Sequence, residues 1–177
     1  MTSEGFAVWF TGLSGAGKTT LAERLVARLR EQRANVELLD GDVVRTNLSQ
    51  GLGFSRADRD TNIRRIGFVT ELLVRNGVIV VVAAISPYRD AREEVKQKIP
   101  KFVEVHMDCS LEILSARDTK GLYKRALAGE IGNFTGISDP YELPLDPAIV
   151  IHSDRESIDE GIEKIWRELE ARGLVCR

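Results

Sequence analysis

A glycine-rich loop that ends in Lys-Thr stands near the start of the chain. Residues 12–19 read GLSGAGKT, a full match to the pattern G-x-x-x-x-G-K-[ST] of loops that hold the phosphates of a nucleoside triphosphate. The glycines allow backbone conformations closed to other residues, so that successive N–H groups turn towards the phosphates. Lys18 would neutralise the β- and γ-phosphates, and the Thr19 hydroxyl would be a ligand of Mg²⁺. The chemistry indicated is phosphoryl transfer, and the alternative is a glycine-rich turn that binds nothing.

Two carboxylates follow the next apolar run, in the stretch LLDGDVVR. Ligands of parallel sheets lie at the carboxyl ends of the strands, so Asp40, Asp42 and Arg45 should face the phosphate loop. A carboxylate in that place can organise the water shell of Mg²⁺ or accept a proton from an alcohol. The alternative is an Asp-Gly turn with solvated acids. The chain has no NKxD sequence and no DxxG after this run, which favours a kinase over a GTPase switch.

A polar stretch, LGFSRADRDTNIRR, offers groups that suit an anionic phosphate acceptor. Arg59, Asn62 and Arg65 are spaced i, i+3 and i+6, which predicts one polar side of a helix whose apolar stripe contains Ile63 and Ile66. A solvated charged face is the alternative.

Alternating strands and helices must position these residues. Apolar runs predict strands over 6–11, 36–40, 78–85, 102–108 and 148–152. Apolar stripes at helical spacing predict helices from 21 to about 32, over 58–75, 91–98 and 111–117, and around 158–169. This alternation predicts an α/β fold of the P-loop NTPase type, a doubly wound parallel sheet with helices on both faces. We expect residues 1–177 to form a single domain.

Composition excludes several classes of protein. The chain is 43% hydrophobic and 29% charged, as in ordinary globular proteins. Its net charge of −2 gives no general attraction to nucleic acid or to an anionic membrane. The longest apolar run is too short to cross a bilayer, and the two cysteines, Cys109 and Cys176, form no disulfide framework. We therefore expect a cytoplasmic protein that binds neither nucleic acid nor membrane.

Together, several segments resemble the adenylylsulfate kinase family from residue 12 to about 142. They are GLSGAGKTT, LDGDVVR, LGFSRADRDTNIRR, ISPYRDAR and DTKGLYKRALAGEIGNFTGISDPYE. The resemblance implies transfer of the γ-phosphoryl group of ATP to the 3′-hydroxyl of adenosine 5′-phosphosulfate, with Mg²⁺, and it suggests a homodimer. The open alternatives are another small-molecule kinase, acting on a sugar acid or a nucleoside monophosphate, and a nucleotide-binding module without turnover.

The resemblance also implies roles for individual residues. ATP would contact Gly12, Leu13, Ser14, Gly15, Ala16, Gly17, Lys18, Thr19 and Thr20, with Arg117 on its adenine. The acceptor would contact Asp42, Arg45, Phe54, Arg59, Asn62, Arg65, Ile85, Ser86, Lys120 and Phe134. Thr19 and Asp40 would hold the metal, and Lys18, Asp40, Asp42 and Ser86 are the catalytic candidates.

Two of these expectations need a physical qualification. The family pattern proposes Ser86 as a phosphoserine intermediate, but direct in-line transfer suffices, and a hydrogen bond from Ser86 at the strand end is the simpler interpretation.

Residues 118–147 are rich in glycine yet basic at Lys120, Lys124 and Arg125. We expect this segment to be a lid that closes over the transferring phosphate and excludes water.

Overall fold

Five parallel strands form the centre of the protein. The computed structural model describes residues 4–32, 34–118 and 120–176. The strands are β1 (Ala7–Thr11), β2 (Val36–Asp40), β3 (Ile79–Ala83), β4 (Phe102–Asp108) and β5 (Ile149–His152). They lie in the order β2-β3-β1-β4-β5, every pair parallel. The predicted doubly wound parallel sheet is confirmed.

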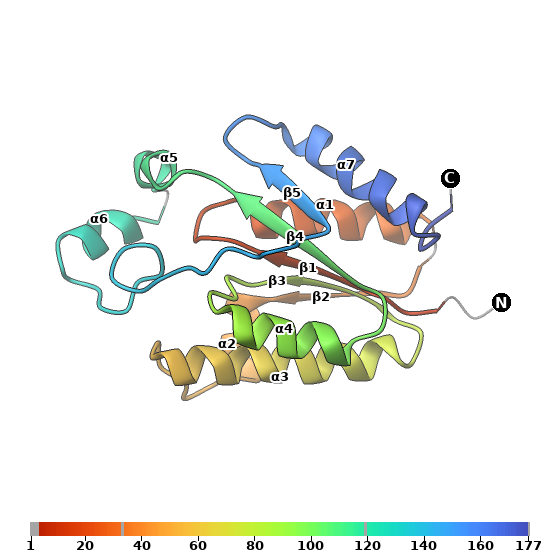
Figure 1. Ribbon diagram of the computed structural model, residues 1–177, viewed down its shortest axis with the longest axis horizontal. Helices are drawn as coiled ribbons and strands as arrows, with labels where there is room; N and C mark the ends of the chain where they lie inside the picture. The colour runs from red at the N-terminus through yellow and green to blue at the C-terminus, as the bar shows by residue number, and fades with distance from the viewer. Residues whose placement is uncertain (1–3, 33, 119, 177) are drawn as a thin grey trace.

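Helices cover both faces of this sheet (Figure 1). Helices α1 (Lys18–Glu31) and α7 (Ile158–Ala171) pack together on one face, and α3 (Arg56–Val74) and α4 (Arg89–Lys98) pack together on the other. Three short helices, α2 (Gly41–Asn47), α5 (Leu111–Arg117) and α6 (Leu122–Leu127), lie at the carboxyl end of the strands. None of the described helices is long and apolar enough to span a bilayer.

Strand β1 shows why the sheet needs helices on both sides. Its five residues are all buried, and successive side chains of a strand point to opposite faces. Val8 and Phe10 join the apolar core beneath α1 and α7, whereas Ala7 and Trp9 join the core beneath α3 and α4. The central strand therefore ends, at Thr11, between two packed layers that hold it in place.

Local capping explains where two of the helices begin. Helix α3 starts at Arg56, two residues before the prediction, because the Ser55 side chain accepts a hydrogen bond from the Asp58 N–H and caps the helix. Asp40 caps α2 in the same way through the Asp42 N–H. Helices α2 and α6, of seven and six residues, were not predicted from the sequence, whereas α5, also of seven residues, was.

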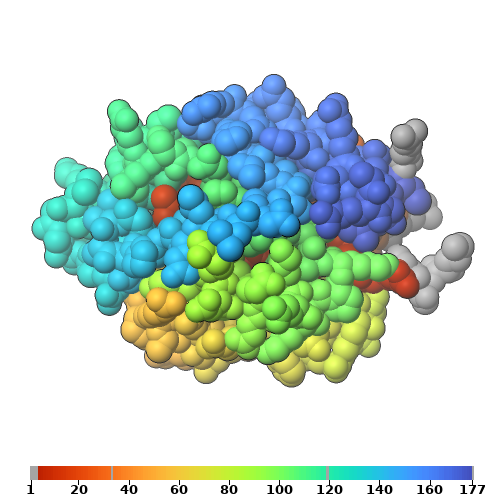
Figure 2. Space-filling model, viewed as in Figure 1, coloured from red at the N-terminus to blue at the C-terminus, as the bar shows by residue number. Residues whose placement is uncertain are grey.

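The predicted lid, residues 118–147, loops out beyond the end of the sheet and returns to β5 (Figure 1). It contains α6 and otherwise irregular chain; residue 119 lies outside the described residues. In the space-filling view the segment covers one end of the molecule and runs back across its front face (Figure 2). It is therefore placed to close the carboxyl edge of the sheet.

Candidate active site

The phosphate loop connects β1 to α1 and adopts backbone conformations that glycine permits. Gly15 and Gly17 have φ angles of 78° and 88°, in the left-handed region that other residues avoid. At Gly12 a Cβ atom would lie 2.6 Å from the Met107 carbonyl oxygen, so a side chain there would collide with β4. The loop thus lies directly on the sheet, with the N-terminus of α1 behind it, as anion binding requires.

The Lys18 side chain is folded back over the loop. Its Nζ donates to the carbonyl oxygens of Gly12 at 3.0 Å and Leu13 at 2.7 Å. Burial lowers the pKa of Lys18 to about 8, although the nearby carboxylates Asp40 and Asp42 oppose that shift. An anion in the loop would supply the counter-charge that this buried ammonium lacks.

Asp40 links the loop to the neighbouring strand. Thr19 Oγ1 donates to Asp40 Oδ2 at 2.8 Å, and Asp40 Oδ1 accepts the Asp42 N–H at 2.9 Å. Among the described residues there is no cluster of three His, Cys, Asp or Glu side chains that could form a metal cage. A hydroxyl beside one carboxylate fits Mg²⁺, which proteins usually hold with one or two side chains together with substrate phosphates and water.

An aromatic ring between two guanidinium groups forms the far wall of the cavity. Phe54 is 55% exposed, and the guanidinium carbons of Arg45 and Arg59 lie 4.5 and 5.5 Å from its ring centre. Arg59 is buried and donates through Nε to the Phe54 carbonyl oxygen at 3.0 Å. Burial lowers the pKa of Arg45, and the positive charge of Arg59 lowers it further. Two cations held this close together favour an anionic ligand.

The helix that carries Arg59 contributes a second polar group but not the predicted third. Asn62 lines the cavity, and its buried Oδ1 has no hydrogen-bond partner among the described residues. Arg65 is exposed outside the cavity and donates to the Leu48 carbonyl oxygen at 3.1 Å. At 3.6 residues per turn a spacing of six places Arg65 about 120° around the helix from Arg59, so α3 cannot present both to one ligand.

Ser86 lines the cavity but its hydroxyl is engaged inside the protein. Ser86 is 1% exposed, and its Oγ accepts a hydrogen bond from the Trp9 indole at 2.9 Å. Its φ of 49° is unusual for a residue with a side chain. The arrangement suits a residue that shapes the turn after β3. It does not present a free nucleophile.

The lid segment contacts both halves of the cavity. Lys120 Nζ lies 3.2 Å from Asp42 Oδ2, and the Tyr123 hydroxyl donates to the Ser14 carbonyl oxygen of the phosphate loop at 2.6 Å. Tyr123 also packs edge-on against Phe134, with ring centres 5.1 Å apart. Arg59 donates to the Asn133 carbonyl oxygen. Tyr123 was not among the predicted site residues, although it stands in the segment KGLYK that carried the family resemblance.

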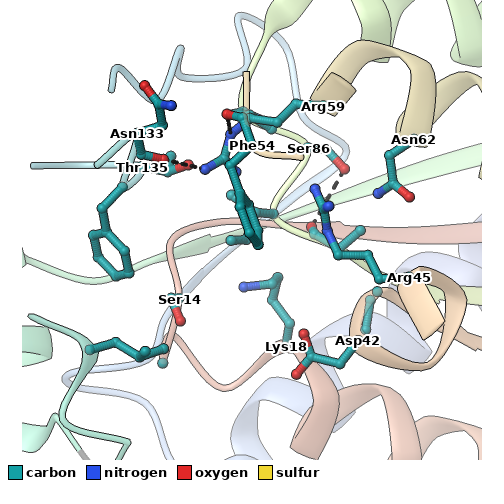
Figure 3. Close-up of a pocket in the computed structure, with 18 of the residues that line it drawn as sticks. Ser14, Lys18, Asp42, Arg45, Phe54, Arg59, Asn62, Ser86, Asn133 and Thr135 are labelled. Atoms are coloured by element: carbon teal, nitrogen blue, oxygen red, sulfur yellow. Dashed lines mark hydrogen bonds between the residues drawn. The ribbon is translucent and has the colours of Figure 1, made fainter. Parts of the chain in front are cut away.

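These groups surround one cavity of about 340 Å³ (Figure 3). In Figure 3 Lys18, Asp42, Arg45 and the ring of Phe54 face a common space. The predicted residues that line it are Ser14, Gly15, Lys18, Thr19, Asp40, Asp42, Arg45, Phe54, Arg59, Asn62, Ile85, Ser86, Lys120 and Phe134. Asn133 and Thr135 line it as well without having been predicted.

Other predicted residues lie around the phosphate loop, outside the cavity wall. Ala16 is buried in the core, Thr20 is exposed on the first turn of α1, and Leu13 packs against the core beside Gly136 of the lid. Arg117 ends α5 and donates to the Ser153 carbonyl oxygen at 3.1 Å, just beyond β5. Arg117 therefore lies at the carboxyl edge of the sheet, on the β5 side.

Comparison with known proteins gives a consistent result. A family model described as adenylylsulphate kinase matches residues 4–152. A Rippkaea orientalis protein named adenylyl-sulfate kinase is 58% identical over 177 residues, which cover 100% of this chain and 98% of that protein.

Solved structures agree with the sequence comparison. The Mycobacterium tuberculosis APS kinase CysC in complex with AMPPNP and APS has a TM-score of 0.90 and 42% identity, over 94% of this chain and 98% of that one. A hexameric APS kinase from Thiobacillus denitrificans has a TM-score of 0.76 and 40% identity, over 99% of this chain and 30% of that one.

Proposed function

This chain belongs to the adenylylsulphate kinase family, and from that premise we propose how its cavity performs the family's reaction. The enzyme transfers the γ-phosphoryl group of ATP to the 3′-hydroxyl of adenosine 5′-phosphosulfate, forming 3′-phosphoadenosine 5′-phosphosulfate and ADP. A single observation carries the proposal: one cavity is bounded by a phosphate loop on one side and by the Arg45–Phe54–Arg59 cluster on the other.

ATP binds at the phosphate-loop side. The backbone N–H groups of residues 12–19 receive the phosphates, and Lys18 exchanges its two carbonyl partners for phosphate oxygens. Arg117, at the carboxyl edge near Ser153, packs on the adenine of ATP. In the complex the pKa of Lys18 rises again, because the charge of the phosphates compensates for the burial of the ammonium group.

Adenosine 5′-phosphosulfate binds at the opposite side. Its adenine stacks on Phe54 with Phe134 on the other face, since both rings line the cavity. Arg45 and Arg59 bind the phosphosulfate. The negative charge of this group offsets the repulsion between the two guanidinium groups. Asn62 Oδ1, which is buried without a partner in the described structure, accepts a hydrogen bond from a ribose hydroxyl.

Thr19 and Asp40, whose oxygens are 2.8 Å apart, would hold Mg²⁺. When bound, it would neutralise charge on the β- and γ-phosphates during transfer. Both oxygens of Asp40 already have partners, whereas the Asp42 carboxylate is paired, among the described residues, with the exposed Lys120 alone. We therefore assign the proton of the 3′-hydroxyl to the Asp42 carboxylate.

The transfer itself is a direct in-line displacement. A bond forms between the acceptor O3′ and the γ-phosphorus while the bond to the β,γ-bridging oxygen breaks, and ADP leaves. The lid supplies Lys120 to the cavity and reduces access of water. Ser86 takes no covalent part, because its buried hydroxyl accepts from Trp9.

A substrate panel tests this assignment. ADP release would be measured with adenylylsulfate, AMP and gluconate offered separately. We expect turnover with adenylylsulfate alone, because only that acceptor carries both the adenine and the phosphosulfate that the cluster fits. Turnover with AMP or gluconate but not adenylylsulfate would indicate a sibling kinase. ATP binding without turnover of any acceptor would indicate a regulatory module.

We also propose a homodimer that works in the cytoplasm. Val43 on α2 and Phe68 on α3 are each 62% exposed, and a dimer interface would bury such side chains. Cys109 and Cys176 are free thiols, as is usual in a reducing compartment. Sedimentation at micromolar concentration tests the assembly; a monomer, or a hexamer like the Thiobacillus denitrificans relative, would contradict it. Cell fractionation tests the location.

A further inference from the structure

A buried guanidinium lies behind the acceptor half of the cavity. Arg92 of α4 is 3% exposed and is not among the described residues that line the cavity. Its Nε lies 3.4 Å from Glu104 Oε1 on β4. Its two terminal nitrogens each donate to a main-chain carbonyl oxygen at 2.5 Å, one of Ser86 and one of Glu142. One planar group thereby joins the turn after β3, strand β4 and residue Glu142.

A second set of hydrogen bonds joins two of these segments, the turn after β3 and the chain around Glu142. The Tyr141 hydroxyl is 2.8 Å from Thr11 Oγ1, and that threonine donates to the Ile85 carbonyl oxygen at 2.7 Å. The Glu142 N–H donates to the Pro87 carbonyl oxygen at 2.8 Å. Residues 85–87, the turn after β3, are therefore fixed to residues 141–142, which we call the lid stem.

The turn and the lid stem both bear on the acceptor side of the cavity. Residues 85–87 line it directly, and the turn contains the non-glycine residue Ser86 at φ 49°. Such a conformation persists only where surrounding contacts hold it. The lid stem follows Asn133, Phe134 and Thr135, which also line the cavity. Movement of the stem relative to the turn would alter the acceptor pocket from both sides.

We propose that Arg92 is a positioning residue for the sulfonucleotide acceptor, acting through the carbonyl groups of Ser86 and Glu142 without touching the substrate. The proposal rests on the acceptor site assigned above and adds to it a residue outside the cavity. The planar fork of arginine can donate to both carbonyls at once while facing Glu104; the ammonium of lysine is a single point on a flexible stem and cannot reproduce that geometry.

Two variants test the role of Arg92. Arg92→Lys keeps a positive charge opposite the buried Glu104, which an uncharged replacement would leave unpaired at great cost to folding. Tyr141→Phe removes only the hydroxyl that bonds Thr11 and keeps the ring that stacks on His106 at 5.9 Å. Thr70→Val is the control: Thr70 is fully buried and donates to the Ile66 carbonyl oxygen within α3, so it also loses one buried hydroxyl.

Steady-state constants for both substrates provide the first readout. For Arg92→Lys we expect the KM for adenylylsulfate to rise about tenfold or more, the effect of losing one or two hydrogen bonds, while the KM for ATP stays within about twofold. Tyr141→Phe should show the same selectivity at about threefold to tenfold. Thr70→Val should change neither KM.

Thermal shifts provide a second readout that does not depend on turnover. The rise in Tm produced by adenylylsulfate should shrink in both variants, whereas the rise produced by a non-hydrolysable ATP analogue should persist. Equal changes for the two ligands, or a lower Tm with unchanged KM values, would overturn the proposal and leave Arg92 as a purely structural residue. If Arg92→Lys does not fold, Tyr141→Phe decides by the same criteria.

The acceptor assignment itself is checked by Arg59→Ala in parallel. Selective loss of adenylylsulfate binding in Arg59→Ala but not in the Arg92 and Tyr141 variants would reject the positioning role alone. If Arg59→Ala also affects both substrates equally, the acceptor site is misplaced and the wider functional proposal fails.

Discussion

At the scale of single residues, Lys18 should give the enzyme a pH dependence on the alkaline side. Burial lowers its pKa from 10.5 to about 8 in the protein without substrate. As the pH rises through 8, the free enzyme loses this proton, and with it the charge that receives the phosphates. We expect kcat/KM for ATP to be level well below pH 8 and to fall as the pH rises through 8, because that constant reports the free enzyme.

Lys18→Arg is the control for this pH profile. Arginine remains charged throughout the range, so the variant should be less active but should lack the bend near pH 8. The same bend in Lys18→Arg would assign the titration to another group.

Arg59 should contribute to acceptor binding and little to ATP binding. Arg59→Ala removes a buried guanidinium that faces Phe54 and lies beside Arg45. The KM for adenylylsulfate should rise about tenfold to a hundredfold, the value of one charge-assisted contact, with a much smaller change for ATP. Arg64→Ala is the matched control, because Arg64 lies on the same helix, α3, and makes an exposed ion pair with Glu94. This variant should leave both constants unchanged. Equal effects of Arg59→Ala on both substrates would contradict the assignment.

At the scale of secondary-structure elements, α3 and α4 approach closely at Gly67. A Cβ atom at Gly67 would lie 2.6 Å from Val95 Cγ2, and the branched valine has little freedom to move aside. Gly67→Ala should lower the free energy of unfolding by about 1–3 kcal/mol through overpacking, although alanine favours the helix by about 1 kcal/mol. Urea unfolding measures the change.

The double variant Gly67→Ala/Val95→Ala tests the cause. The new methyl group would occupy part of the space that Val95 vacates. The double variant should therefore lose about 1 kcal/mol less stability than the sum of the losses in the two single variants. Simple additivity, or a neutral Gly67→Ala, would show that the two helices are not in close contact there.

The sequence predicted the five strands and the longer helices, and of the three short helices it predicted only α5. The central strands β1 and β3 are five buried residues each, which appear as unbroken apolar runs. The phosphate loop is a local pattern, and its strand and helix were found with it. Helices α2 and α6 have no measurable period, and α2 exists because Asp40, a residue singled out for chemistry, also caps it.

The cavity wall was harder to predict than the loop because it depends on contacts between distant segments. Tyr123 reaches the carbonyl of Ser14, 109 residues away, and Arg92 reaches that of Glu142, 50 residues away. No spacing in the chain encodes such pairs. For Arg65 a local spacing was misleading. The spacing of three residues between Arg59, Asn62 and Arg65 suggested one helix face, but the rotation per residue places Arg65 outside the cavity, where it donates to the Leu48 carbonyl oxygen.

At the scale of the whole molecule, recognition of two anions is local, because the net charge is only −2. Attraction between guanidinium groups and the phosphosulfate is weakened by salt, whereas stacking on Phe54 is not. We expect the KM for adenylylsulfate to rise several-fold between about 0.05 and 0.5 M potassium chloride. In Arg59→Ala this salt dependence should be shallower, and an unchanged slope would indicate that other groups carry the attraction.

All strands run in one direction, so the two edges of the sheet have different neighbours. At the amino edge, Glu4 pairs with Lys101 just before β4, and the Cys176 carbonyl oxygen accepts from Gln32 just after α1. The cavity is lined by residues that follow the carboxyl ends of β1, β2 and β3, at the opposite edge of the sheet. A flexible tether on either end of the chain would therefore leave the opening of the cavity unobstructed. The tether could lead to a solid support or to another enzyme that supplies the sulfonucleotide.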